Sequence, residues 1–536
     1  MFRKKAKPDE QAPLAAGASA AEQDRTDPLG ALAGYTEQAS LLSEGHGTRL
    51  EYVAVLNGSA AAKHYLRLSV PEDVERAGLL RRMLLELPER TTGFEDLLAL
   101  PELELAAALM QPPATMADYL APQAKQPAPA LRVIDLLDGL RELCQLLLVA
   151  RQEYGLGWGA PAAAGVGLTA ENAGGPPGYL RWRCTFLGWD ALAHDAAEEA
   201  PALLALFGEA LARLAQTAEE QGLAFCASQA RRAAVWLAER GQLAKLDCAA
   251  LATALAQLRF DYITIAATDT GRRREHNEDA YLTMQLDQLS AAGARFTLAA
   301  VADGMGGHLS GEVASSLTLD MLRQQLLLAM LPPRTRPADP RLLPEQLAAA
   351  IPAIGRALSE RAQLDVGLSG MGTTLCGLAL LETQSTLPEL AADAAAGYIF
   401  SVGDSRAYLT SAAGLSLLTH DHSYVQQLVD SGSISEEEAF DHPNKNVVTH
   451  CLGGGGGDST PDIYSLELGP GDLVLLCSDG LSDALRDREL WQMFCSQGAV
   501  QAPPDELAPL ALALIAAANL AGGPDNITVI LLGCTL

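Results

Sequence analysis

The sequence predicts an α+β protein: a β core flanked by helices in the C-terminal half, preceded by a mostly helical N-terminal domain. The length of 536 residues exceeds what one typical core fills, which favours at least two domains. Beyond residue 260, several apolar runs are joined by turns too short for a crossover, so these strands are expected to be antiparallel neighbours. Leu/Ala patterns at helical spacing lie between the strands and before them. Periodicity alone does not separate this arrangement from other layered α/β folds.

The elements of the C-terminal half follow from this pattern. The apolar runs predict strands at 263–268, 280–286, 296–302, 374–380, 398–402 and 406–409. Apolar residues at helical spacing predict helices at 311–331, 344–361, 423–431 and 506–520.

The N-terminal half gives a weaker signal. Residues 1–28 are rich in Ala, Pro and charge, and we expect a disordered leader. Two strands at 50–56 and 65–68 and a helix at 136–152 then predict a small sheet followed by helices in a domain of residues 29–255. The order resembles the lobe pair of a protein kinase, but GLGWGAPAAAGVGL and CTFLGWD stand where a catalytic Asp and an Asp-Phe-Gly motif belong. A degenerate kinase-like module and a generic regulatory or docking domain both stay open.

Charge and cysteine usage restrict the partners and the compartment. A net charge of −28 without a basic stripe predicts no nucleic-acid partner, because the phosphate backbone would be repelled. Nine scattered cysteines without a C-x-x-C pair fit a reducing cytoplasm. No signal peptide is recognisable at the start, and the apolar run 507–520 is shorter than the roughly 20 residues of a membrane span, so no membrane association is expected.

Acidic residues adjoin apolar strands at five places in the C-terminal half. Asp303 closes the apolar run of FTLAAVADGMGGH, where glycines let the backbone approach a ligand. The other places are Asp479 in GDLVLLCSDGLSD, Asp525 before ITVILL, Glu278 and Asp279 before YLTMQL, and Asp404 in a Gly-Asp-Ser-Arg turn. Any one of them alone is best explained as a turn residue. Five on one sheet system can converge, and carboxylates without His or Cys ligands favour magnesium or manganese over zinc.

The motifs R-R-E-H-N-E-D-A, A-D-G-M-G-G-H, G-D-S-R-A-Y, S-D-G-L-S-D and G-P-D-N-I-T-V-I occur in this order between about residues 260 and 536. In this order they resemble the metal-dependent protein phosphatases of type 2C, and LTHDHSYVQQLVDSG and NVVTHCLG resemble the bacterial branch. The resemblance implies a β-sandwich of two antiparallel sheets flanked by helices at 256–536. It also implies Ser/Thr phosphomonoester hydrolysis, with phosphorylated protein substrates made by Ser/Thr kinases.

The resemblance assigns roles to the motif residues. Asp303 would bridge two ions and the Gly304 carbonyl would add a ligand, so Asp303 and Arg274 are the expected catalytic residues. Arg274 would bind the substrate phosphate, which a planar guanidinium contacts through two oxygens at once. The remaining metal ligands would be Asp479 and Asp525 on one ion, Glu278 or Asp279 on the other, directly or through water, and Asp404 on a third, looser ion.

Two cations sharing a carboxylate would activate a water for in-line attack on the phosphorus, with no protein nucleophile. Many relatives carry a histidine proton donor where Met305 stands here, and bacterial relatives also carry Met. His308, His420 and His422 are alternative donors, although a structural role is the commoner one for such residues. Two other functions compete with an active protein phosphatase: a non-catalytic scaffold that binds phosphoproteins, and a phosphatase of small phosphorylated metabolites.

Overall fold

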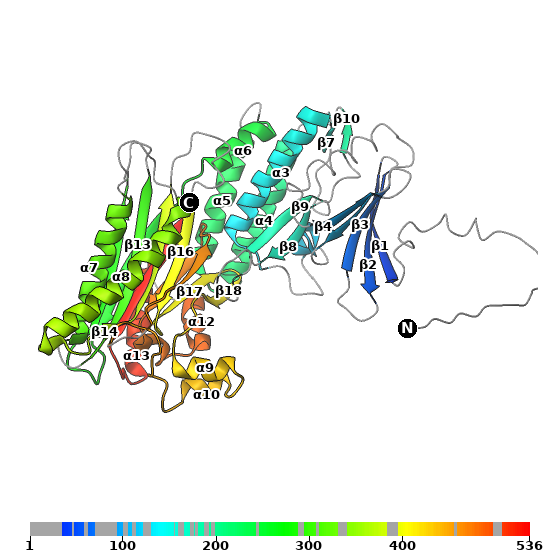
Figure 1. The fold of residues 1–536 in the computed structure, drawn as a ribbon. Helices are drawn as coiled ribbons and strands as arrows, with labels where there is room; N and C mark the ends of the chain where they lie inside the picture. The colour runs from blue at the N-terminus through cyan, green and yellow to red at the C-terminus, as the bar shows by residue number, and fades with distance from the viewer. Residues whose placement is uncertain are drawn as a thin grey trace, which may run out of the picture. The chain divides into compact units, whose positions relative to one another are not determined.

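A computed structural model of the chain gives the architecture (Figure 1). The structure describes residues 35–45, 48–57, 63–69, 94–99, 105–109, 114–121, 130–154, 156–158, 166–171, 176, 179, 181–186, 192–194, 199–242, 246–287, 294–306, 310–330, 340–382, 395–454, 458–496 and 506–536. The leader predicted at 1–28 and His308 lie outside these residues. The chain forms two compact units, one of residues 1–88 and 94–112, and one of residues 89–93 and 113–536.

The first unit contains one antiparallel sheet of five strands in the order β1-β2-β3-β5-β4. The strands are β1 (Tyr35–Gly45), β2 (Thr48–Asn57), β3 (Lys63–Ser69), β4 (Phe94–Ala99) and β5 (Leu105–Leu109). The strands predicted at 50–56 and 65–68 are confirmed, because they fall within β2 and β3.

The second unit begins with a helical region, residues 113–256, in which the predicted helix at 136–152 is confirmed as α3. The helices are α2 (Met116–Leu120), α3 (Val133–Tyr154), α4 (Ala200–Glu220), α5 (Ala224–Gly241) and α6 (Cys248–Ala256). Short antiparallel strands accompany them: β6 (Ala114–Thr115), β7 (Leu156–Trp158), β8 (Val166–Glu171), β9 (Arg181–Phe186) and β10 (Leu192–His194).

The rest of the second unit, residues 261–536, is a sandwich of two antiparallel sheets, as expected. One sheet has the order β11-β22-β21-β17-β18, and the other β19-β14-β13-β15-β16-β20 with β12 also paired to β13. The strands are β11 (Asp261–Asp269), β12 (Asp279–Leu286), β13 (Arg295–Met305), β14 (Gly372–Thr373), β15 (Leu375–Glu382), β16 (Ala395–Val402), β17 (Arg406–Ser411), β18 (Gly414–Leu417), β19 (Leu452–Gly453), β20 (Asp462–Leu466), β21 (Leu473–Cys477) and β22 (Ile527–Thr535).

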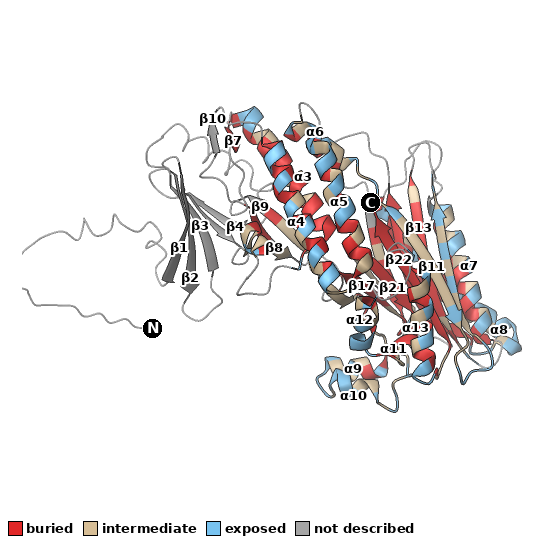
Figure 2. Ribbon diagram, turned by 180° about the vertical axis from the view of Figure 1, so that it is seen from behind, coloured by how far each residue is buried: buried red, intermediate tan, exposed pale blue. Residues whose placement is uncertain are grey.

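Alternation along the strands builds two cores. On β13, Ala299 and Val301 face the second sheet, whereas Leu298 and Ala300 face the helices. Both faces are apolar, and Figure 2 shows the central strands as buried. Helices α7 (Ser310–Met330) and α8 (Leu343–Leu364) cover the β13 sheet, and α13 (Ala508–Leu520) packs on β11 and β22. The remaining helices are α9 (Tyr424–Asp430), α10 (Glu436–Phe440), α11 (Asp479–Ser482), α12 (Asp487–Cys495) and the 3-10 turns Pro340–Leu342 and Val366–Leu368.

A buried arginine joins the helical region to the sandwich. Arg132, 2% exposed, donates to the Asp472 carboxylate at 3.1 Å, to the Glu467 carbonyl at 3.2 Å and to the Tyr179 hydroxyl at 2.9 Å. It also pairs with Asp135, whose carboxylate accepts the Arg132 backbone N–H. A buried charge is tolerated only when it is paired and hydrogen-bonded, so this group fixes α3 to the loop before β21.

Candidate functional site

Asp279 and Asp303 stand directly opposite each other on the antiparallel pair β12 and β13. Side chains of opposed residues on one face of a sheet have Cβ atoms about 4.5–5.5 Å apart. Asp303 lies inside β13, which continues to Met305 and pairs there with β14, whereas the sequence placed it at the strand end. The register therefore brings two of the predicted carboxylates together.

The backbone of Asp303 is held by two threonines. Its N–H donates to the Thr374 hydroxyl at 3.0 Å, and its carbonyl accepts from the Thr373 hydroxyl at 2.8 Å and the Thr374 N–H at 2.9 Å. The Thr374 hydroxyl also bonds the Ser405 hydroxyl at 2.7 Å. Thr374 thus links Asp303 to the turn that carries Asp404.

Asp479 and Asp525 reach the same region from the other sheet. Asp479 is the first residue of α11, directly beyond β21, and Asp525 precedes the neighbouring strand β22. Between them, the Ser478 hydroxyl donates to the Asp279 carboxylate at 2.7 Å and accepts the Thr528 N–H at 3.0 Å. Ser478 therefore ties the ends of both sheets together at the carboxylates.

Asn526 holds the loop that carries Arg274 and Glu278. Its side-chain oxygen accepts the Glu278 N–H at 2.8 Å, and its amide donates to the carbonyls of Thr270 and His276 at 2.9 Å. Sequence reasoning gave no role to Ser478, Thr374 or Asn526. Ser478 and Asn526 are buried, and each stands directly beside a motif aspartate. A polar residue at the end of an apolar strand, where burial would require a hydrogen-bond partner, is the sequence signal that could have identified them.

Arg274 lies at the edge of this site, with its side chain 48% exposed. Its guanidinium donates to the Asp525 carboxylate at 2.6 Å, and this hydrogen bond raises the pKa of Arg274. The charges of Glu278 and Asp303 raise it further. The structure thus brings the predicted phosphate ligand to the predicted metal ligands, where its outer side is open to solvent.

Asp404 occupies a tight turn between β16 and β17. Gly403 before it has φ +107°, and a Cβ there would meet Thr374 Cγ2 at 2.7 Å, so only glycine fits. Asp404 is buried, and the pKa of its carboxyl is raised to about 7, first by burial and then by the charges of Asp421 and Asp483.

The carboxylates raise one another's pKa. Burial, then the charges of Asp279, Asp479, Asp404 and Asp525, hold the pKa of Asp303 well above its usual range. Burial and the charges of Asp404, Asp483 and Asp525 likewise hold the pKa of Asp479 well above its usual range. Burial raises the pKa of Asp279 to about 6 and also raises that of Glu278. Such mutual repulsion shows that the five aspartates share one electrostatic neighbourhood, in which bound cations would relieve the charge.

The donor set fits a hard divalent cation. The buried Oδ1 atoms of Asp279 and Asp479 have no hydrogen-bond partner, which leaves each free to bind a metal. All donors are oxygens, including the Gly304 carbonyl, as magnesium and manganese prefer. Within the described part of the chain, no three Asp, Glu, His or Cys side chains stand at the spacing of a complete metal site.

Two of the three histidines named as proton donors can be placed. His420 pairs with Asp430 at 3.0 Å. Both ring nitrogens of His422 have partners, the Gly403 N–H and the Asp462 carboxylate, each at 3.2 Å. These contacts agree with the structural role that the sequence favoured for lone histidines.

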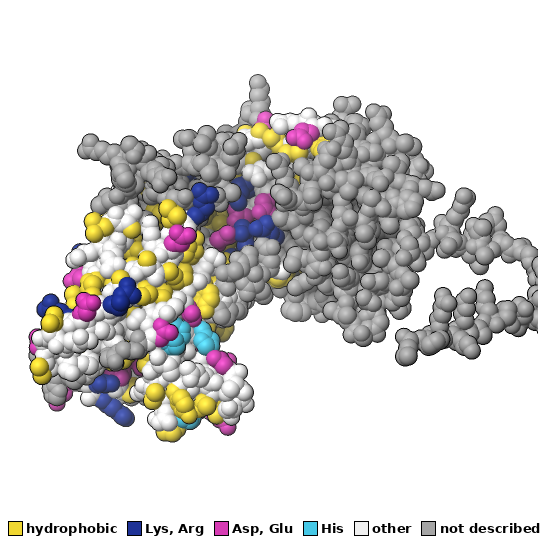
Figure 3. Space-filling view, viewed as in Figure 1, with side chains coloured by type: hydrophobic (Ala, Val, Ile, Leu, Met, Phe, Trp, Pro, Cys, Tyr) yellow, Lys and Arg dark blue, Asp and Glu magenta, His cyan; other side chains and the backbone are white. Residues whose placement is uncertain are grey.

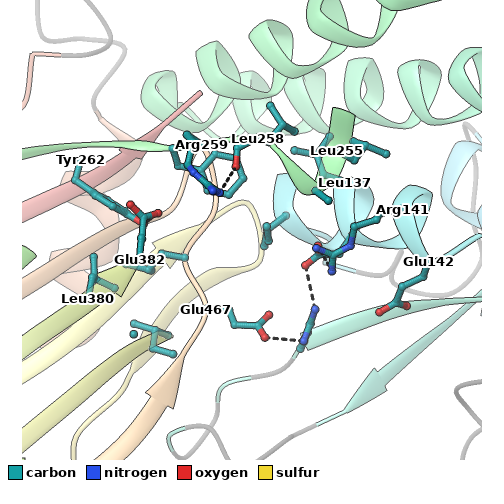
Figure 4. Close-up of a pocket in the computed structure, with 18 of the residues that line it drawn as sticks. Leu137, Arg141, Glu142, Leu255, Leu258, Arg259, Tyr262, Leu380, Glu382 and Glu467 are labelled. Carbon is teal, nitrogen blue, oxygen red and sulfur yellow. Dashed lines mark hydrogen bonds and ion pairs between the residues drawn. The ribbon is translucent and has the colours of Figure 1, made fainter. Parts of the chain in front are cut away.

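A cavity of about 350 Å³ lies elsewhere in the second unit, between the helical region and the sandwich (Figure 4). Helix α3 supplies Leu137, Arg141 and Glu142 to one side, and strands β11 and β15 supply Tyr262 and Glu382 to the other. Four arginines and four carboxylates line it, so its charge favours no ligand class. None of the predicted site residues lines it.

Comparison with known proteins matches the sequence of the chain to one family. The model of the family Protein phosphatase 2C matches residues 268–513. The Ser/Thr protein phosphatase PstP of Mycobacterium tuberculosis is 37% identical over 265 residues, which are 49% of this chain and 43% of PstP. The Ser/Thr phosphatase stp of Listeria monocytogenes is 32% identical over 264 residues, 49% of this chain and 92% of stp. A solved catalytic domain of PstP in complex with two manganese ions is 32% identical and covers 52% of this chain and all of that one, with a TM-score of 0.38.

Sequence similarity places the chain among the protein phosphatases. The chain belongs to the protein phosphatase 2C family, in its bacterial Ser/Thr branch. It spans less than half the length of the mycobacterial relative and nearly all of the listerial one.

Proposed function

We propose that the protein hydrolyses phosphoserine and phosphothreonine in phosphorylated proteins, with two Mg²⁺ or Mn²⁺ ions and a third, looser one. The observation that carries this is the Asp279–Asp303 pair, two partly buried carboxylates that stand opposite each other in one sheet and whose pKa values are both raised. Asp303 would serve both main ions, with the Gly304 carbonyl, Asp479 and Asp525 on one of them. Glu278 or Asp279, directly or through water, would serve the other, and Asp404 the third.

When bound, the cations lower the pKa of water and offset the charge that builds up on the phosphoryl group. The chain supplies the rest. Arg274 binds the phosphate oxygens, and its pairing with Asp525 keeps the guanidinium oriented beside the carboxylates. Ser478 and Thr374 fix Asp279 and Asp303 so that the ligands are preorganised before the substrate arrives.

We further propose that the substrates are products of Ser/Thr kinases and that the protein acts in signal transduction in the cytoplasm. The free thiols of all nine cysteines support a reducing compartment. Among the described residues, no helix has the length and apolar character needed to cross a membrane.

Residues 29–255 are proposed to regulate or dock substrates, with the predicted domain boundary near 256 kept as a proposal. The contacts of Arg132 with Asp472 and Glu467 support a fixed attachment of the helical region. Whether this region derives from a kinase is a question of ancestry that leaves the proposed role unchanged.

The test is metal-dependent hydrolysis. The purified full chain should release phosphate from phosphoserine and phosphothreonine peptides only with added Mg²⁺ or Mn²⁺. Asp303→Asn should lose at least about 99% of the rate, since an amide does not offset two cations. Full turnover in excess chelator would refute the mechanism, binding of phosphopeptide without turnover would favour the scaffold, and turnover of small esters alone would favour the metabolite phosphatase.

A further inference from the structure

His422 forms hydrogen bonds with both backbone groups of Gly403, the residue before Asp404. Its backbone N–H donates to the Gly403 carbonyl at 2.8 Å, and its ring Nδ1 accepts the Gly403 N–H at 3.2 Å. Both backbone groups of Gly403 are thus satisfied by one residue 19 positions later in the chain. The His422 side chain is only 10% exposed, so water does not readily replace these bonds.

The bond to Gly403 fixes the proton on the ring. Because Nδ1 accepts a backbone N–H, the neutral imidazole carries its proton on Nε2. Nε2 then donates to the Asp462 carboxylate at 3.2 Å, and this bond is the main cause that lowers the pKa of Asp462. Asp462 belongs to β20, where it pairs with Ser401 of β16, so the ring bridges two points at the end of one sheet.

His422 also stands at the base of the segment 423–450, which carries α9 and α10. The His422 carbonyl accepts the Thr449 N–H at 2.8 Å, and the next residue, Ser423, forms a bridge to Val448. The ring lies 4.4 Å from that of His450, centroid to centroid. Figure 3 shows histidine side chains gathered beside acidic ones on this face of the molecule.

On the side away from His422, the Gly403–Asp404 turn contacts Thr374, the residue that also holds the backbone of Asp303. A Cβ at Gly403 would strike Thr374, and the Thr374 hydroxyl bonds both the Asp303 N–H and the Ser405 hydroxyl. The turn is therefore held between Thr374 and His422. Thr374 belongs to the centre of the site, and His422 to the 423–450 segment.

We infer that His422 is a positioning residue that holds the Gly403–Asp404 turn in place through its Nδ1 atom and couples that turn to the segment 423–450. The inference rests on the proposed function, in which Asp404 is a ligand of the third ion. His422 would set how that carboxylate is presented, without touching substrate or metal.

The side-chain series at 422 separates the two ring contacts. In His422→Asn, the Oδ1 atom stands where Nδ1 stood and still accepts the Gly403 N–H. In His422→Gln, the side chain reaches the Nε2 position and keeps the Asp462 contact only. His422→Ala loses both, and His420→Asn is the matched control, because His420 is 40% exposed and pairs with Asp430 on the surface.

Two readouts on the full-length chain are needed. The first is hydrolysis of an aryl phosphate against Mn²⁺ concentration. We expect kcat within about threefold of wild type for His422→Asn, and about tenfold lower for His422→Gln and His422→Ala, the effect of roughly one hydrogen bond. KM for the ester should change less than twofold, and the Mn²⁺ concentration for half-maximal rate should rise several-fold. The second is amide hydrogen exchange in the segment 398–405 of the metal-free, full-length protein. Exchange there should be faster than in wild type in His422→Gln and His422→Ala only.

A wild-type result for His422→Gln with loss in His422→Asn would assign the role to Asp462 and overturn the inference. Unchanged exchange and kinetics in all three variants would overturn it too, as would an equal loss in His420→Asn. A wild-type protein without metal-dependent hydrolysis would sink the proposed function instead. The exchange measurement would still decide whether Nδ1 holds the turn, since it needs no turnover.

Discussion

At the scale of single residues, polar side chains that bind neither metal nor phosphate hold the site. Asp303 is held through its backbone by Thr373 and Thr374, and Asp279 is held through its carboxylate by Ser478. Such contacts limit the rotamers that the carboxylates adopt, which is how a protein presents ligands at fixed distances.

Arg274→Ala should weaken substrate binding while leaving metal affinity near that of wild type. A charge-assisted contact to phosphate contributes about 1.5–3 kcal/mol, which corresponds to a rise in KM of about ten- to hundredfold. Steady-state kinetics on a phosphopeptide and calorimetric titration with Mn²⁺ measure the two quantities. Arg273→Ala, the exposed neighbour, serves as control. Collapse of metal affinity at constant KM would show that the main role of Arg274 is to orient Asp525.

Asn526→Ala should loosen the 270–278 loop. The change removes three hydrogen bonds to Glu278, Thr270 and His276 and should lower the free energy of unfolding by about 1–3 kcal/mol. The rate on a small aryl phosphate should fall with it, because Arg274 and Glu278 share that loop. Denaturant unfolding and kcat/KM are the measurements, with exposed Asn444→Ala as control. Normal stability with normal activity would show that Asn526 is dispensable.

At the scale of elements, the buried pair Arg132–Asp472 decides how firmly α3 is attached to the sandwich. Arg132→Met leaves Asp472 buried without its cation, which should cost about 3–5 kcal/mol. Adding Asp472→Asn to that variant should restore part of the loss, so the double-mutant cycle should show coupling. Arg141→Met, at a pair with side chains 25% and 17% exposed, should cost no more than about 1 kcal/mol. Additive effects of Arg132→Met and Asp472→Asn would show that the Arg132–Asp472 pair does not hold α3 to the sandwich.

The fragment 256–536 tests the predicted boundary. All proposed ligands and Arg274 lie within it, so it should retain metal-dependent hydrolysis of an aryl phosphate. In the fragment, Asp472 loses its partner Arg132 and Gly533 loses its neighbour Phe225. The fragment should therefore unfold at lower denaturant concentration than the full chain. An inactive but folded, metal-loaded fragment would show that the helical region completes the site, and the boundary would move to about residue 113.

At the scale of the whole molecule, the acidic cluster should make the metal-free protein sensitive to pH. The pKa values of Asp404 and Asp279, raised to about 7 and about 6, mean that the folded chain binds protons that the unfolded chain releases. Stability should therefore fall as pH rises from about 4 to 7, the sign that linkage gives for raised acid pKa values. Tm in chelator should drop by roughly 1–2 °C for each kcal/mol lost, because the entropy of unfolding grows with the length of the chain. Mn²⁺ should abolish the slope, and Asp404→Asn should reduce it. A flat profile in chelator would show that the carboxylates do not repel one another.

The sequence predicted the sandwich and the acidic residues near its strand ends better than the side chains that hold those acidic residues in place. The strand at 296–302 was recoverable because burial on both faces produces an uninterrupted apolar run, and the strand at 280–286 because inward-facing apolar residues alternate with exposed ones. Asp303 and Asp479 were visible because each follows such a run. The partners of Thr374, 71 residues from Asp303, and of His422 were not, since their contacts depend on tertiary packing that no local pattern encodes. The attachment of α3 to the sandwich was hidden for the same reason: Arg132 and Asp472 are 340 residues apart.

Two glycines of the sandwich, Gly469 and Gly533, leave room for the helices that pack against it. A Cβ at Gly469 would collide with Ile134 of α3, and one at Gly533 would meet the Phe225 ring of α5 at 2.6 Å. A sandwich that stands alone has no need to leave either position without a side chain. Glycine at both places is therefore a criterion for sorting sequences into those that carry the helical cover and those that do not. The same positions offer a steric wedge: Gly469→Val would push the helices off without altering any charge, and would yield an undocked form of the intact chain for comparison.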